Sequence, residues 1–436
     1  MNILRKLNKR LQSGEQGGIF KGILTLLIGS GLARIISIGS IPFLTRIYTP
    51  EDYAVLALYI SFTAIFSQIL TLRYVQALPL PRHDLAAFNL FSLCAKLIAL
   101  GSGLLAIVLW LIGEELLAFF SMGALYKWWP LIVLGSAGAA FYELFSLWAT
   151  RKRQYKAMAK SQLNQSIISS ATKIVLGLLA FKPIGLMVGQ MLSQSAGIAN
   201  LYRSVQNDYL LYSKKICTEK QLFMGRYYQG FVWFRLPSQI LMVVSVQAPV
   251  LMMAALYNKE VTGQLSLALM AISLPMGLIG KSVANAFYAE IANINRTDLN
   301  NIKEITLMVQ RKLFMVGIPI ALAIVLLSER LFVIAFGPEW LMAGKYATIL
   351  APFLLFQFTS SPLMEVINII GSQFYFMVLH SCRVIGLILV YLVFQNLEVD
   401  SVWFVSIISI YLSIFYLSAS LLVLVTLSRA QRKGCK

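Results

Sequence analysis

The chain has 436 residues, of which 58% are hydrophobic and only 13% are charged. Ordinary soluble domains carry roughly a quarter charged residues, whereas here the apolar residues form many separate runs long enough to cross a bilayer. This composition excludes a soluble domain. The net charge of +19 does not indicate nucleic-acid binding, because the basic residues alternate between loops instead of gathering on one polar face.

The apolar runs predict about twelve transmembrane helices. A run of about 20 residues is enough to cross a hydrocarbon core of roughly 30 Å. In chain order the runs lie near residues 20–42, 53–72, 88–112, 128–150, 161–181, 183–202, 231–256, 263–289, 313–327, 346–370, 374–394 and 402–427. The expected fold class is therefore an all-α polytopic membrane protein.

A polar stretch near the middle of the chain divides the predicted helices into two groups of six, which favours two lobes around a central cavity. The first residues place Ile3, Leu4, Leu7 and Leu11 on one helical face and basic residues on the other, as in a surface helix. The expected domains are an amphipathic cytoplasmic segment (1–19), an N-lobe (20–206), a cytoplasmic linker (207–226), a C-lobe (227–427) and a basic cytoplasmic tail (428–436).

The distribution of positive charge predicts the orientation in the membrane. Cytoplasmic loops are enriched in Lys and Arg, and most of the 37 basic residues fall on one predicted side. The opposite side holds only Arg46, Lys127, Lys182, Lys259, Arg330 and Lys345. We therefore expect a multi-pass membrane protein with both termini in the cytoplasm.

Basic residues inside the predicted helices outnumber acidic ones. Each Lys or Arg at a helix centre costs roughly 2.5–3.5 kcal/mol on insertion scales, yet the helices contain Arg34, Lys96, Lys173, Arg235, Lys281 and Arg383. The acids there are only Glu143 and Glu365. Cations without a fixed partner at depth attract an anion, and a pyrophosphate diester would suit Arg forks and Lys point charges together.

The bases differ in how well they suit a cavity. Arg34 follows Gly29, Ser30 and Gly31, small residues that permit close approach. Lys96 lies near a helix start and is expected to reach the interface, and the same alternative stays open for Arg235 and Arg383. The candidate cationic cavity is Arg34, Lys173, Arg235, Lys281 and Arg383.

Glu143 and Glu365 have two interpretations. A carboxyl at depth can bind and release a coupling ion such as H⁺ or Na⁺, or it can neutralise a neighbouring base as a structural pair. No other cofactor is expected, because the chain has two histidines and its four cysteines form no C-x-x-C motif. The sequence indicates no enzyme, metal site or disulfide.

Short motifs carry a family resemblance. Residues 45–53 read TRIYTPEDY, Leu72-Arg73-Tyr74 follows the second helix, and 336–340 read FGPEW. The chain resembles the Wzx-type O-antigen and capsule flippases of the multidrug/oligosaccharidyl-lipid/polysaccharide (MOP) exporter superfamily. It departs from the family pattern at two positions. Ala54 stands where the family commonly has Gly, and Val75 stands where an acidic residue often follows Arg-Tyr.

The resemblance implies a two-lobed transporter of the bacterial inner membrane that opens alternately to each side and moves undecaprenyl-pyrophosphate-linked repeat units. Its implied partners are membrane lipids, a polysaccharide polymerase and a chain-length regulator. The gate or loop motif would comprise Arg46, Tyr48, Pro50, Glu51, Asp52 and Arg73. From the residues alone, Pro50, Glu51 and Asp52 favour a helix-capping turn, because Pro suits a first helical turn and acids suit the helix N-terminus.

Two alternatives remain. A cation-coupled exporter of small molecules from the same superfamily would be expected to have an acid-rich cavity, and the surplus of bases disfavours it. A membrane polysaccharide polymerase would need polar catalytic residues on a sizeable outer loop, and every predicted outer loop is short.

Overall fold

The computed structural model describes residues 14–120, 123–273, 283, 299–370, 373–397 and 399–434. Within these ranges all regular secondary structure is helical. The described chain forms two compact units: a first unit that runs to Tyr48 and resumes over Leu58–Ile240, and a second unit made of Thr49–Ala57 and the residues from Leu241 onward. The amphipathic helix predicted at Met1–Leu11 lies outside the described residues.

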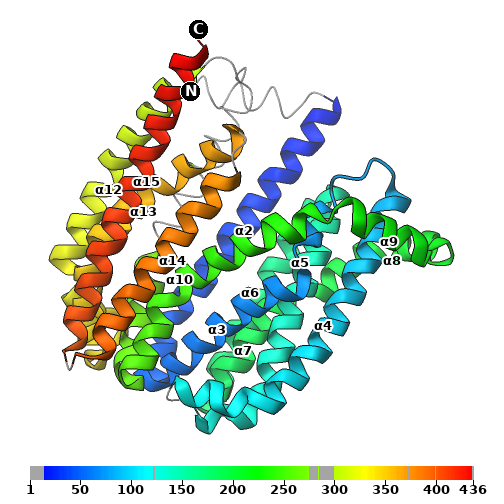
Figure 1. The fold of residues 1–436 in the computed structure, drawn as a ribbon. Helices are drawn as coiled ribbons and strands as arrows, with labels where there is room; N and C mark the ends of the chain where they lie inside the picture. Colours follow the sequence, from blue (N-terminus) through cyan, green and yellow to red (C-terminus); the bar gives the residue numbers. More distant parts are fainter. Residues whose placement is uncertain are drawn as a thin grey trace. The chain divides into compact units, whose positions relative to one another are not determined.

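The first unit is built from long helices that pack side by side. Within it α2 packs on α6, α6 on α7, and α5 on α4 and α7 (Figure 1). In chain order the helical elements up to residue 235 are α2 (Gly14–Ile47), α3 (Pro50–Thr71), whose residues to Ala57 belong to the second unit, η1 (Tyr74–Ala77), α4 (Asp84–Phe119), η2 (Gly123–Trp128), α5 (Trp129–Arg151), α6 (Tyr155–Leu178), α7 (Ile184–Ser195), α8 (Ile198–Tyr212), η3 (Ser213–Lys215), α9 (Thr218–Tyr227) and the π-helical turn η4 (Phe231–Arg235).

The second unit holds the remaining helices, with α13 packed between α12 and α15, and α14 against α15. Its core residues include Leu313 of α12 and Phe358 of α13. The elements are α10 (Leu236–Leu256), which begins at the end of the first unit, a helical stretch over 259–273, α12 (Leu299–Phe336), η5 (Pro338–Trp340), α13 (Leu341–Ile370), α14 (Gln373–Gln395) and α15 (Ser401–Gly434).

Eleven of the predicted helices coincide with helical structure, as does the described part of the eighth, and the differences have physical causes. The helix predicted at 313–327 spans Leu299–Phe336, because charged residues at both ends shorten an apolar run without ending the helix. The helix predicted at 183–202 breaks at Ala196 into α7 and α8. There Gly197 lies against α6, and its carbonyl accepts a hydrogen bond from Ser161 Oγ at 3.0 Å.

Nine of the helices that the structure describes are long and apolar enough to cross a membrane. Helix α6 is not among them, because it carries many serines and glutamines that bond to neighbouring helices. Helices α7 and α8 are individually short, with 12 and 15 residues. The eighth predicted helix, 263–289, falls largely outside the described residues beyond 273. The predicted lobe boundaries remain predictions.

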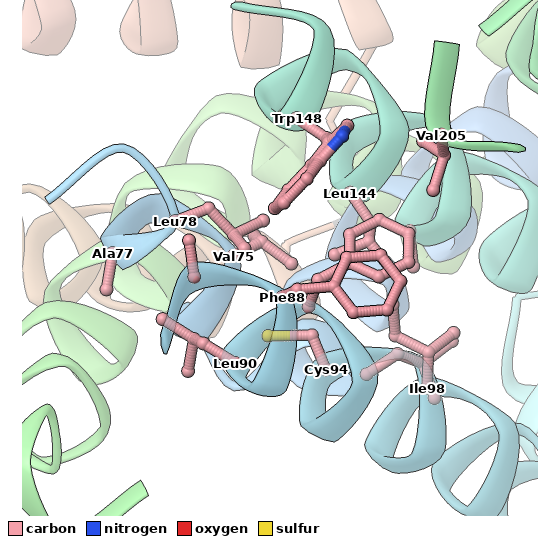
Figure 2. Close-up of a cluster of buried hydrophobic side chains, with 14 residues drawn as sticks. Val75, Ala77, Leu78, Phe88, Leu90, Cys94, Ile98, Leu144, Trp148 and Val205 are labelled. Atoms are coloured by element: carbon pink, nitrogen blue, oxygen red, sulfur yellow. The ribbon is translucent and has the colours of Figure 1, made fainter. Parts of the chain in front are cut away.

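A buried apolar cluster fixes the loop between α3 and α4. Val75, Ala77 and Leu78 belong to one cluster with side chains of α4, α5 and α8, which Figure 2 draws as sticks. At its centre the Phe88 and Trp148 rings meet edge to face, with centroids 5.4 Å apart. This packing holds the backbone immediately after Arg73 in one place.

Arg151 secures the same loop from the polar side. Its guanidinium donates to the carbonyls of Leu78, Pro79 and Pro81, the last at 2.7 Å, and also to Asp84 at 2.8 Å. One side chain therefore satisfies three carbonyls of a segment that makes no regular helix or sheet. The loop that carries Arg73 is thus held by both apolar packing and charge-assisted hydrogen bonds.

Candidate functional site

Polar side chains line the contact between α2 and α6. Ser30 Oγ donates to Gln162 Oε1 at 2.5 Å, and the Ser37 and Ser166 hydroxyls lie 2.8 Å apart. Arg34, one turn beyond Ser30, is half-buried, and it forms no ion pair with any residue the structure describes. The small residues predicted to permit close approach do so here, since a Cβ at Gly29 would lie 2.7 Å from the Ala159 side chain of α6.

Lys173 lies further along α6, where it is only 9% exposed. Its ammonium donates to Gln190 Oε1 of α7 at 2.9 Å, and within the described part of the chain no carboxylate pairs with it. Gly189 makes room for it, because a Cβ at that position would overlap the aliphatic part of Lys173. A buried ammonium with one neutral acceptor retains hydrogen-bonding capacity for a further acceptor.

Tyr48 connects the TRIYTPEDY motif to this region. Its hydroxyl donates to the backbone carbonyl of Lys173 at 2.7 Å, and the residue is 1% exposed. Gly177 and Gly185 lie against the ring, so close that a side chain at either would overlap it. Lys182 lies over the same ring at 5.8 Å from its centroid. Tyr48 is therefore anchored to α6 at the turn that carries Lys173.

The rest of the motif forms the capped start of α3. The Thr49 amide donates to Asp52 Oδ2 at 3.0 Å, and the Asp52 amide reaches Thr49 Oγ1 at 3.4 Å, which is a reciprocal capping arrangement. Pro50 is the first helical residue, and the Glu51 and Arg46 side chains are exposed. The predicted helix-capping turn is confirmed, and a gating role stays a prediction.

Arg73 forms an ion pair with Glu143, the acid for which the sequence left two interpretations open. It is 6% exposed, has a left-handed backbone (φ 57°), and its Nη1 lies 3.2 Å from Glu143 Oε1, whose side chain is 28% exposed. It also donates to Gln68 and, at 3.4 Å, to Gln239. Glu143 thus adopts the structural pairing that the sequence offered as one of its two interpretations.

Burial lowers the pKa of the Arg73 guanidinium, the Glu143 carboxylate opposes that shift, and the nearby Arg235 charge adds to it. The group still stays charged at neutral pH. Arg235 itself is exposed in the π-helical turn η4, where it reaches Gln76 at 3.4 Å and lies over the Phe231 ring at 5.2 Å. The structure therefore gathers Arg73, Glu143 and Arg235 in one cluster.

Arg383 is buried in the second unit, on α14, at 3% exposure. Its Nη1 donates to the Tyr416 hydroxyl at 3.0 Å, and its guanidinium lies over the rings of Tyr416 and Phe415 at 5.3 and 5.8 Å. Its Nε is buried and has no hydrogen-bond partner among the residues the structure describes. Aromatic faces stabilise a cation without neutralising it.

The predicted site residues fall into separate groups. Lys281 lies outside the described residues, as does the side chain of Glu365. The structure brings Tyr48 to Lys173, and Arg73 to Glu143 and Arg235, while Arg383 lies in the other unit. Sequence reasoning missed the neutral partners of the basic residues, which are Gln190 for Lys173, Gln239 for Arg73 and Tyr416 for Arg383. The one signal in the sequence that could have indicated them is a polar or phenolic side chain within an apolar helix.

A family model described as "Polysaccharide biosynthesis protein" matches residues 43–345, which is more than half of the chain. That range includes the Tyr48 motif, Arg73, Glu143 and Lys173. No curated protein matches the sequence.

Solved structures share the fold. The lipid II flippase MurJ in its inward closed conformation has 16% identity over 91% of this chain and 98% of its own, with a TM-score of 0.57. A multidrug resistance MATE family transporter of the MOP superfamily, in an outward-facing conformation, has 13% identity over 94% of this chain and 96% of its own (TM-score 0.60). A MOP superfamily transporter from Pyrococcus furiosus has 14% identity over 94% of this chain and 96% of its own (TM-score 0.58).

Proposed function

Since the chain belongs to the polysaccharide biosynthesis protein family and has the MOP transporter fold, we propose that it flips undecaprenyl-pyrophosphate-linked oligosaccharide from the cytoplasmic to the periplasmic leaflet. O-antigen or capsule repeat units are the substrates proposed. The protein is then a transporter, not an enzyme, of the bacterial inner membrane with both termini in the cytoplasm. A polymerase and a chain-length regulator are its proposed partners.

The observation that carries this proposal is the buried Lys173 ammonium. A buried charge is costly unless it is paired, and Lys173 has a glutamine where a structural pair would have a carboxylate. Arg383 repeats the pattern, with a phenol and two aromatic rings around it. Buried cations without a carboxylate partner are suited to bind an anion reversibly, as transport of a pyrophosphate requires.

In the proposed cycle the basic residues hold the pyrophosphate, the sugars occupy the polar cavity and the polyprenyl tail stays in lipid. Arg34, Lys173, Arg235, Lys281 and Arg383 are the proposed ligands, and coupling to H⁺ or Na⁺ is proposed at Glu143 or Glu365. Binding that was equally tight in both conformations would not drive the cycle, because a ligand shifts an equilibrium only by its differential affinity.

The chain offers a matched pair of variants to test the role of Lys173. Lys96 also donates to a glutamine, Gln221, at the same 2.9 Å, but it is exposed. A strain that lacks its own copy of the gene would be complemented with wild type, Lys173→Gln or Lys96→Gln, each adjusted to equal membrane abundance. Surface polysaccharide and lipid-linked repeat units would be measured in each strain.

Under the proposal, Lys173→Gln loses surface polysaccharide and accumulates lipid-linked units on the cytoplasmic side, while Lys96→Gln restores production. Full production by Lys173→Gln would show that this cation does not serve the substrate. Failure of the wild type to restore any polysaccharide would refute the flippase assignment. Units that reach the periplasm but stay unpolymerised would favour the polymerase alternative.

A further inference from the structure

The first unit contains a polar pocket of about 450 Å³ that is separate from the residues discussed above. It lies where the turn between α5 and α6 meets α8. The lining residues that matter here are Lys152, Gln154, Lys160, Asn200, Arg203 and Asp208. Its size is in the range of small-molecule sites, but its lining is basic and amide-rich instead of apolar.

The single carboxylate of the lining is already engaged. Asp208 accepts from the Trp148 indole nitrogen at 3.0 Å and from Lys152 Nζ at 3.1 Å. Lys152 also pairs with Asp84 at 2.8 Å. Burial by itself would lower the pKa of Lys152, but the hydrogen bonds to Asp84 and Asp208 outweigh it and raise the pKa above its ordinary value. This network fixes one wall of the pocket.

Lys160 and Arg203 stand apart from that network. Neither forms an ion pair with a described residue, and both line the pocket with exposed side chains. Because Asp84 and Asp208 neutralise the Lys152 charge, Lys160 and Arg203 give the pocket a net positive charge. Asn200 adds amide N–H groups on the same lining.

The start of α6 adds a second source of positive potential. The helix begins at Tyr155, and the side chain of its N-cap residue Gln154 makes no capping hydrogen bond. The first N–H groups of a helix without a side-chain cap are available to an anion. Ala157, in that first turn, is part of the pocket lining.

We propose that this pocket binds a phosphate-bearing anion. A phosphate offers several oxygens to a lysine, an arginine fork and amide donors at once, which a single carboxylate cannot do. The same chemistry occurs in a free phosphate compound and in the headgroup of an acidic lipid. The proposal does not depend on the flippase assignment, because the pocket shares no residue with the proposed transport site.

The test uses the purified full chain and two double variants that each remove two positive charges. Lys160→Gln/Arg203→Gln alters the pocket, whereas Lys214→Gln/Lys215→Gln alters two exposed lysines of η3 that do not line it. Inorganic pyrophosphate binding is measured by calorimetry in detergent. Retention of phosphatidylglycerol against phosphatidylcholine is measured by native mass spectrometry after extraction from mixed nanodiscs. Size-exclusion chromatography checks folding.

The pocket variant is expected to lose at least about tenfold in affinity for pyrophosphate, or to lose its preference for phosphatidylglycerol, since each contact is charge-assisted. The control variant should stay within about twofold of wild type. An effect on pyrophosphate identifies a soluble ligand, and an effect on the lipid alone identifies a headgroup. The proposal is overturned if the pocket variant behaves as wild type toward both probes, or if both double variants lose binding equally.

Discussion

Replacing Glu143 with Gln removes the carboxylate that faces the buried Arg73 guanidinium at 3.2 Å. Breaking a buried ion pair by removing one partner costs about 3–5 kcal/mol. Because 28% of the Glu143 side chain is exposed, solvent screens part of this cost. We therefore expect the free energy of unfolding to fall by about 2–4 kcal/mol. The nearby Arg235 charge, no longer offset, contributes to the loss.

A double-mutant cycle with Arg73→Gln isolates the pair. The combined Arg73→Gln/Glu143→Gln variant buries two neutral amides instead of one unpaired charge, so it should be more stable than the sum of the single losses predicts, with a coupling of about 1–3 kcal/mol. Glu115→Gln is the control, because Glu115 is an exposed acid on α4 that forms no ion pair within the described chain.

Equilibrium unfolding in mixed micelles with increasing SDS, followed by tryptophan fluorescence, gives the free-energy differences. Surface polysaccharide per folded molecule is measured in parallel. If Glu143 is a structural partner of Arg73, activity follows the amount of folded protein in every variant. Equal stability of Glu143→Gln and Glu115→Gln would refute the pairing, and a folded Glu143→Gln variant without transport would favour the coupling role.

Changes at four further positions test the packing of the motifs and of the loop that follows α3. Tyr48→Phe removes one buried hydrogen bond and should cost about 0.5–1.5 kcal/mol in the same SDS titration, whereas Gly185→Ala drives a methyl group against the Tyr48 hydroxyl and should cost about 1–3 kcal/mol. Asp52→Ala removes the carboxylate that accepts from the Thr49 amide but leaves the bond from the Asp52 amide to Thr49 Oγ1, so the loss should be about 0.5–1 kcal/mol, with Asp52→Asn in between. Arg151→Lys keeps the charge but loses the fork that holds three carbonyls, so limited trypsin digestion should cut the loop between α3 and α4 faster than in wild type. Unchanged digestion would show that the apolar cluster alone holds this loop.

The sequence by itself predicted the helices, because a bilayer demands long apolar runs whatever their neighbours are. It also predicted the capped start of α3, since a cap depends on residues three positions apart. The surplus of basic residues at depth was likewise visible from composition and position. The resemblance to the MOP superfamily, carried by the Tyr48 and Arg73 motifs, is confirmed by the family match and the shared fold.

Only the tertiary structure decided which polar groups meet. Arg73 and Glu143 are 70 residues apart, and Tyr48 and Lys173 are 125 apart, so no local pattern relates them. The break between α7 and α8 also depends on a remote contact, between Gly197 and Ser161 of α6. Apolar length is a property of one segment, whereas the partner of a buried charge is set by the packing of several helices, which is why the helices could be predicted and the pairs could not.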